Sequence, residues 1–256
     1  MPNKWFVKTR DKKKFALVLD VGTTGIKAFV FDAEGNIVAK ENRKIDEISL
    51  HPGHVEQDPI EIIKLSEDVL RSVVKESGLG EKDFIGLGIS NQRETTVVWD
   101  KKSSWPFYPA IVWKDSRTKN YCDAVGAENN NVVQAKTGLT IQPYFSASKM
   151  QWLFENIPEV KFASDKNCLG MGTVDTWLLW NLTEDRSYLT DETNAARTLI
   201  FNIKTKQWDK DLLNIFSLAM VVLPDVKPSR SNFGKLKKHP HFSIKSRKFF
   251  HYFWEK

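Results

Sequence analysis

The sequence predicts an α/β domain in which a mixed sheet is flanked by helices. Two strand-like runs, residues 15–20 and 26–32, are joined by a glycine turn, and the first run is continuously apolar. A capped helix begins at Asp58 and Pro59, and another short apolar strand follows at residues 84–90. Successive strands, a helix and a further strand are typical of a sheet that carries a helical layer.

The first three strands are expected to form an antiparallel meander. Residues 21–25 turn the chain between the first two strands, and residues 32–36 turn it into a third strand near residues 37–40. The helix that begins at Pro59 has an apolar stripe at helical spacing, formed by Ile62, Leu65, Val69, Leu70 and Val73. This stripe is the face that we expect to pack on the sheet.

Further along, the pattern favours helices at residues 146–156 and 175–181 and a strand at residues 198–203. The second of these helices is rich in tryptophan and leucine. Trp177 and Trp180 stand three positions apart, and this spacing indicates core packing rather than a platform for a ligand.

Charge and composition suggest three segments. The chain has 256 residues, 41% of them hydrophobic, which is enough to bury a substantial core. Its formal charge of +6 is concentrated at the ends: residues 1–14 carry +5 and residues 227–256 carry +8, which leaves −7 between them. We therefore expect a basic extension at 1–14, a domain at 15–234 and a divergent tail at 235–256. Because the basic charge belongs to the ends, it does not indicate a nucleic-acid partner.

The tail has an unusual composition. Residues 239–256, HPHFSIKSRKFFHYFWEK, hold three of the five histidines and six aromatic side chains, with neither a helical nor a strand period. We expect the basic aromatic segment 235–256 to be disordered and residues 239–256 to be dispensable for folding.

The two cysteines and the apolar runs indicate the compartment. Cys122 and Cys168 are too few for a disulfide framework or a zinc site, and they are interpreted as reduced structural thiols. No apolar run approaches the ~18 residues of a membrane span, and the start of the chain lacks the apolar segment of a secretory signal. We expect a cytoplasmic protein.

The turn after the first strand has the residues of a phosphate site. Asp20 ends that strand, and Val-Gly-Thr-Thr-Gly follows. Glycines let backbone amides approach a phosphate, the hydroxyls of Thr23 and Thr24 can donate to it, and a strand-end carboxylate can hold Mg²⁺ through water. Lys27 on the return strand could reach a terminal phosphate. A plain hairpin with turn glycines explains the same residues, so the motif alone leaves both interpretations open.

Arg93 and Glu94 follow the strand at residues 84–90. Neighbouring strand residues point to opposite faces, so this pair can address one ligand only if the chain leaves strand geometry there. Ligands gather beyond the carboxyl ends of strands in open α/β sheets. A guanidinium supplies donors and a carboxylate supplies acceptors, which suits a neutral polyhydroxylic substrate. The alternative is a surface ion pair in a loop.

Together these segments resemble the FGGY carbohydrate kinases and, within that family, the glycerol kinases. The resemblance covers residues 15–234 in the family's order. It rests on LDVGTTGIKAFVFD, HPGHVEQDPIEI, GISNQRETTVVWD, AIVWKDSRT, TGLTIQPYFSASKMQW, GTVDTWLLWNLT and TDETNAARTLIFNIKTKQWD. It implies a ribonuclease H-like fold of the actin and hexokinase type, and ATP-dependent phosphorylation of glycerol to glycerol 3-phosphate.

The resemblance also implies roles for the motif residues. Arg93, Glu94 and Tyr144 would bond the glycerol hydroxyls, and Trp113 would pack against the carbon backbone. The residues that would meet Mg²⁺ and the ATP phosphates are Asp20, Gly22, Thr23, Thr24 and Lys27. The family more usually has a glutamine where Val21 stands and an arginine where Lys27 stands. Both substitutions occur in sugar-kinase relatives, so a kinase of another polyol or sugar is the alternative.

The family has a second domain of similar fold, and the resemblance stops before it. In the resembling enzymes a Gly-Asp-Gln segment supplies the catalytic base, whereas this chain has KLKKHPHFSIKSRKFF at residues 235–250. We therefore expect a polyol-binding half that is inactive alone. ATP would bind only with a second domain, supplied by a complementing C-terminal domain or within an oligomer. A non-catalytic binding or regulatory fragment is the rival from another class.

Overall fold

A computed structural model describes residues 14–237 and 249–251. Its largest sheet has five strands in the order β13-β5-β1-β2-β3. β1 pairs antiparallel with β2 and parallel with β5, so the sheet is mixed, as predicted. The strands are β1 (Phe15–Val21), β2 (Gly25–Phe31), β3 (Ile37–Lys44), β5 (Phe84–Asn91) and β13 (Phe249–His251).

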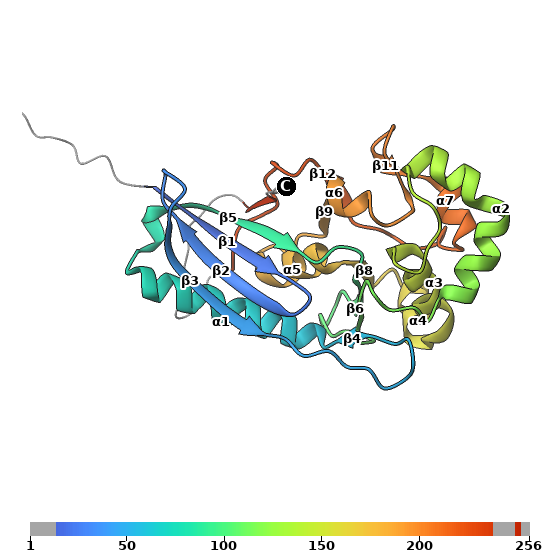
Figure 1. Cartoon of the computed structure of the whole chain (residues 1–256), viewed down its shortest axis with the longest axis horizontal. Helices are drawn as coiled ribbons and strands as arrows, with labels where there is room; N and C mark the ends of the chain where they lie inside the picture. Colours follow the sequence, from blue (N-terminus) through green and yellow to red (C-terminus); the bar gives the residue numbers. More distant parts are fainter. Residues whose placement is uncertain (1–13, 238–248, 252–256) are drawn as a thin grey trace, which may run out of the picture.

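Helix α1 (Pro59–Ser77) lies along one face of this sheet (Figure 1). The Asp58 side chain accepts a hydrogen bond from the Ile60 amide at 2.8 Å, and Gly78, with φ of 64°, ends the helix. The expected stripe is buried except for Leu65, which is half-buried against the same core. A short 3₁₀ turn (Glu81–Asp83) then leads into β5. The meander, the capped helix and the next strand are thus confirmed.

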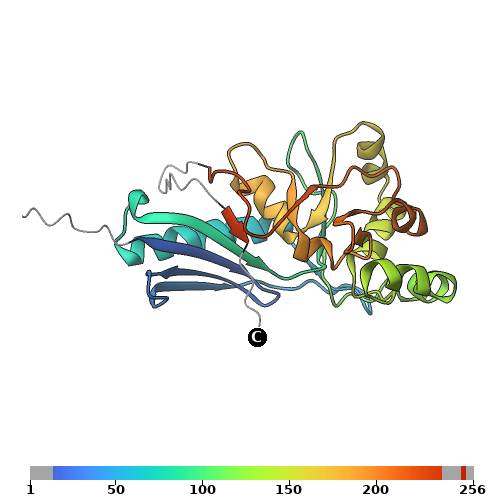
Figure 2. The ribbon, with the colours of Figure 1, turned by 90° about the horizontal axis from the view of Figure 1, so that it is seen from above.

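A second, antiparallel sheet has the order β4-β7-β6-β8 and carries most of the remaining helices on one side. Figure 2 shows the five-stranded sheet at one end of the molecule and these helices at the other. The strands of this second sheet are β4 (Glu56–Gln57), β6 (Thr96–Asp100), β7 (Ala110–Ile111) and β8 (Leu169–Thr173). The longer helices after α1 in the chain are α2 (Lys119–Thr137), α3 (Ser146–Asn156), α4 (Pro158–Asp165), α5 (Val174–Leu182) and α7 (Lys210–Ile215).

The tryptophans of α5 pack in the core, as predicted. Trp177 is fully buried and Trp180 nearly so, and both rings contact the fully buried Trp99 of β6, with centroids 5.2 and 5.9 Å away. Gly170 on β8 makes room for that cluster, because a Cβ there would lie 2.2 Å from the Trp99 ring. The aromatic cluster therefore joins the two sheets through α5.

The strand predicted at residues 198–203 is wrong for most of its length. Only β10 (Phe201–Asn202) is extended, and it pairs with β11 (Gln207–Trp208). Leu199 has φ of 69°, which interrupts a strand, and the Thr198 amide and hydroxyl both donate to the carbonyl of Ala195. The segment instead closes the short helix α6 (Glu192–Ala195), which follows β9 (Leu189–Asp191). β9 pairs with β12 (Asp225–Lys227).

The tail prediction concerns residues that the structure describes only in part. Leu236 is buried, and the Lys237 amide donates to the carbonyl of Leu182 at 2.8 Å, so this start of the tail packs on the end of α5. Phe249–His251 form strand β13 beside β5. The expectation for the segment 235–256 as a whole stays a prediction, because most of it is not described. Residues 238–248 and 252–256, like residues 1–13, lie outside the described part of the chain.

Both cysteines are free thiols, Cys122 buried and Cys168 half-buried. Burial raises the pKa of the Cys122 thiol, as befits a structural residue. Within the described ranges, none of the helices combines the length and the apolar character that crossing a bilayer requires.

Candidate functional site

The glycine turn between β1 and β2 is held by close backbone contacts. The Gly22 amide donates to the carbonyl of Gly25 at 3.0 Å. A Cβ at Gly22 would lie 3.1 Å from that carbonyl oxygen, and a Cβ at Gly25 would lie 3.0 Å from the carbonyl oxygen of Arg43. Close approach of the backbone therefore favours glycine at both positions.

The side chains around this turn have few internal partners. Asp20 and Lys27 are directly opposed across β1 and β2, which places both side chains on one face of the sheet. Within residues 14–237, neither side chain forms a hydrogen bond or an ion pair. Thr24 is exposed. A carboxylate, an ammonium group and a hydroxyl thus stand together with their bonding capacity unused.

Arg93 and Glu94 lie where the chain leaves strand geometry, as the sequence predicted. β5 ends at Asn91, and the Thr95 amide donates to the Arg93 carbonyl at 2.7 Å, which closes a three-residue turn centred on Glu94. Glu94 has φ of 63°, a conformation that is costly for a residue with a side chain. The Ser146 hydroxyl at the start of α3 donates to the Glu94 carbonyl at 3.0 Å and anchors this turn.

The Glu94 side chain is buried and paired with a residue that the sequence reasoning missed. Its Oε1 accepts a hydrogen bond from Arg197 Nε at 2.6 Å, and Glu94 is 3% exposed. The Arg197 guanidinium also lies 4.8 Å from the Phe145 ring centroid and 5.6 Å from that of Tyr144. A buried carboxylate needs such a partner. The only sequence signal was the segment NAART, 103 positions away from Glu94.

Trp113 and Tyr144 form an aromatic wall beside the glycine turn. Their ring centroids are 5.2 Å apart. The indole Nε1 of Trp113 donates to Thr23 Oγ1 at 2.9 Å, and Tyr144 is 37% exposed. The structure therefore brings four predicted site residues together: Glu94 and Tyr144 through Arg197, and Trp113 and Thr23 through a direct hydrogen bond.

Arg93 faces a cavity that Glu94 does not line. This cavity of about 440 Å³ is lined by Arg93, Arg197, Lys206 and Glu192, with further residues of α6 and β10. Lys206 pairs with Glu192 at 3.1 Å. The two adjacent residues that the sequence singled out thus differ in setting, since Glu94 is buried and Arg93 lines a cavity.

Lys149 is a second residue that sequence reasoning missed. It is fully buried on α3, and its Nζ donates to three consecutive carbonyls, those of Pro143, Tyr144 and Phe145, at 2.6, 2.8 and 3.0 Å. Burial lowers its pKa to about 7, against the opposing effects of the Asp115 and Glu94 carboxylates. These bonds fix the segment that carries Tyr144.

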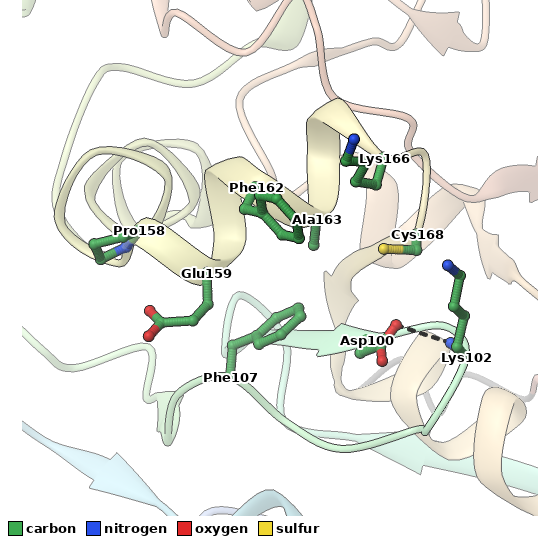
Figure 3. Close-up of a pocket in the computed structure, with 9 residues that line it drawn as sticks. All are labelled: Asp100, Lys102, Phe107, Pro158, Glu159, Phe162, Ala163, Lys166 and Cys168. Carbon is green, nitrogen blue, oxygen red and sulfur yellow. Dashed lines mark hydrogen bonds between the residues drawn. The ribbon is translucent and has the colours of Figure 1, made fainter.

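A larger cavity lies away from these residues, between α4 and the loop after β6 (Figure 3). Its volume is about 560 Å³, and its walls are mainly apolar, with Phe107 and Phe162 facing each other and Asp100 and Lys102 at one end. No predicted site residue lines it. Cavity size alone therefore does not identify the predicted site residues.

The mixed sheet with a glycine turn at the end of its central strand defines a domain of the ribonuclease H-like class that actin and hexokinase share. Residues 15–244 match the FGGY family of carbohydrate kinases, N-terminal domain. The chain belongs to this family.

The chain is similar to longer kinases. The chain is 43% identical over 225 residues to the glycerol kinase of Burkholderia ambifaria, with 88% of this chain and 45% of the relative covered. The crystal structure of Plasmodium falciparum glycerol kinase with ADP superposes with a TM-score of 0.84 at 37% identity, over 92% of this chain and 47% of that one. Gluconate kinase from Lactobacillus acidophilus shares the fold at 22% identity and a TM-score of 0.80. The chain spans about half the length of these relatives.

Proposed function

We propose that this chain is the polyol-binding half of an ATP-dependent kinase that converts glycerol to glycerol 3-phosphate. The observation that carries the proposal is the Trp113 indole, which forms the wall beside Tyr144 and also donates to Thr23 of the glycine turn. A small polyol packed on this wall would therefore lie next to a turn suited to phosphate. The matches to glycerol kinases over most of this chain support the choice of substrate.

The polyol half of the site would use Arg93, Glu94, Trp113 and Tyr144. One Glu94 oxygen is taken by Arg197, while Oε2 accepts no hydrogen bond from any residue in the described ranges and is open to a substrate hydroxyl. Arg93 would donate to a neighbouring hydroxyl from the cavity wall. The Trp113 ring would cover the carbon backbone, which has no polar groups to satisfy.

The phosphate half would use the turn. The Gly22 region would bring backbone N–H groups close to a phosphate, and Thr23, Thr24 and Lys27 would donate to its oxygens. Asp20 would hold Mg²⁺ through water, because it is a carboxylate without a partner among the described residues. No larger cluster of metal ligands occurs in the described ranges. Bound Mg²⁺ would neutralise charge on the phosphates.

The reaction is a matter of positioning. A glycerol hydroxyl oxygen forms a bond to the γ-phosphorus as the bond from that phosphorus to the β–γ bridging oxygen breaks, and the hydroxyl proton passes to a base. This chain would hold the attacking hydroxyl with Glu94 and Arg93 and align it toward the turn. The base is assigned to the family's second domain. We propose the cytoplasm as the compartment of the reaction, because ATP is available there.

The test is a calorimetric titration of the 256-residue chain with glycerol, repeated with a five-carbon polyol. Saturable binding of glycerol, abolished by Trp113→Ala and unaffected by Trp105→Ala on the exposed surface, is the expected result. Tighter binding of the longer polyol would move the proposal to another sugar alcohol. Absence of binding by a folded wild-type chain would overturn the assignment.

A further inference from the structure

A closed ring of hydrogen bonds joins the glycine turn to the polyol half of the site. Gln57 Nε2 donates to the Thr23 carbonyl at 2.7 Å, and Gln92 Nε2 donates to Gln57 Oε1 at 2.6 Å. The Thr95 hydroxyl donates to Gln92 Oε1 at 3.2 Å. The Trp113 amide donates to Thr95 Oγ1 at 3.1 Å, and its indole Nε1 donates to Thr23 Oγ1, which closes the ring.

The direction of every bond in this ring is determined. The Thr23 carbonyl can only accept, so the amide nitrogen of Gln57 must face it, and the amide oxygen of Gln57 must face Gln92. At the other end both N–H groups of Trp113 can only donate. Gln57 is fully buried and Gln92 is 8% exposed, so water does not compete effectively for these bonds. A glutamate at either position cannot supply the Nε2 donor.

The two glutamines lie between elements that the proposed reaction must align. Gln57 is on β4, one residue before the cap of α1. Gln92 immediately precedes Arg93, and its backbone amide donates to the carbonyl of Val21 at 2.7 Å. The ring therefore connects the end of β1, the turn after it and the residues next to the proposed glycerol contacts.

We infer that Gln57 and Gln92 are positioning residues that couple polyol binding to the conformation of the phosphate turn. A polyol that packs on the Trp113 ring fixes the indole, the indole fixes Thr23, and the glutamines hold the Thr23 carbonyl in the matching position. This inference rests on the proposed function, because it takes the polyol to bind at Trp113.

The test uses nuclear magnetic resonance of the wild-type chain and of isosteric glutamine-to-glutamate variants, with glycerol as the probe. The Trp113 indole resonance, assigned by its loss in Trp113→Phe, reports binding, and the Thr24 amide, which lies outside the ring, reports the turn. In the wild type both should shift together. In Gln57→Glu and Gln92→Glu, glycerol should bind about 2- to 12-fold more weakly, as for a lost neutral hydrogen bond, and the Thr24 response should disappear.

The matched control is Gln134→Glu, the same chemical change on the exposed face of α2, which should behave as the wild type. A wild-type chain whose indole does not respond to glycerol would remove the proposed function itself. A wild type that binds glycerol without any change at Thr24, or glutamate variants that keep the full Thr24 response at saturation, would overturn the coupling alone. The wild-type titration tests both glycerol binding and its coupling to Thr24, even if a variant does not fold.

Discussion

The two halves of the site differ in how their side chains are satisfied. In the polyol half, Glu94 is paired with Arg197, and the backbone around Tyr144 is held by Lys149. In the phosphate half, Asp20 and Lys27 have no bonding partner among residues 14–237. The first half is shaped by bonds within the chain. The charges of the second are available to the proposed phosphate and Mg²⁺, so we expect the first half alone to be preorganised for its ligand.

The physical reason lies in burial. Glu94 and Lys149 are charged groups inside the protein, where an unpaired charge is expensive, so internal partners are required before any substrate arrives. Asp20 and Lys27 are within reach of solvent, where water satisfies them until phosphate or Mg²⁺ replaces it. Preorganisation of the polyol half would reduce the free energy that the proposed binding of glycerol must supply.

The largest expected effect separates binding from turnover. The chain should bind glycerol but show no measurable ATP-dependent phosphorylation, because it spans about half the length of the kinases that it matches, and the proposal assigns the base to the other half. A coupled assay with Mg²⁺, ATP and glycerol measures this. Addition of a separately produced C-terminal half from a relative is the matched complementation control. Turnover by this chain alone at roughly 1–100 s⁻¹, an ordinary kinase rate, would contradict the assignment of the base.

The next effect compares one residue from each half. Glu94→Ala should weaken glycerol binding roughly 10- to 150-fold, because it removes a charged hydrogen-bonding group worth ~1.5–3 kcal/mol. Arg93→Ala should fall in the same range. Asp20→Ala should leave glycerol affinity unchanged, since that carboxylate is assigned to Mg²⁺ and phosphate. Calorimetric titration of the three variants provides the comparison.

The control for that series is Glu128→Ala, which removes an exposed carboxylate on α2. It separates loss of a site contact from a general change in charge. Normal glycerol affinity in both the Arg93 and Glu94 variants would favour a purely structural role for the buried Glu94–Arg197 pair and remove the main support for a polyol at this turn.

A smaller effect, from pH, follows from Lys149. Burial lowers its pKa to about 7, while the unfolded chain keeps a value near 10.5. Between these values the unfolded chain binds more protons, so the contribution of Lys149 to the free energy of unfolding rises with pH. That contribution is lost as pH falls through 7. Glycerol binding should change in the opposite sense, because a neutral amine has two N–H donors for three carbonyls.

The measurement is a pair of pH profiles between about 6 and 9 for the wild type and Lys149→Met, one from denaturant unfolding and one from glycerol titration. We expect glycerol affinity of the wild type to fall about 2- to 12-fold above the Lys149 pKa, the effect of one neutral hydrogen bond. The methionine variant should lack both trends. Parallel slopes in the two proteins would show that another group titrates.

Local patterns in the sequence were enough to predict most of the fold. The glycine turn, the Asp58 cap and the apolar stripe of α1 are signals within a few residues, and all three appear in the structure as expected. The strand at 198–203 failed because the positive φ at Leu199 has no composition signal. A leucine in an apolar run gives no indication that the chain turns there.

Only the site residues that belong to recognisable sequence motifs could be predicted. Glu94 and Tyr144 were found because they stand in recognisable segments, but Arg197 and Lys149 were not, although both hold those residues in place. A buried charge implies that some partner exists without identifying it. Such a partner can lie anywhere in the chain, and the sequence gives no distance between residues that are 103 positions apart.

The smallest expected effect is found within the turn itself. Thr23 and Thr24 are neighbours, yet among the described residues only the Thr23 hydroxyl accepts a hydrogen bond, from the Trp113 indole. Thr24→Val should change the free energy of unfolding by no more than ~0.5 kcal/mol, as for most surface substitutions. Thr23→Val should cost ~1 kcal/mol, at the low end for an unsatisfied donor because the indole is only half-buried. Urea unfolding of both variants, with the indole proton resonance of Trp113 as a local reporter, makes the comparison. Equal stabilities and an unshifted indole resonance in Thr23→Val would show that this hydrogen bond does not link the two halves.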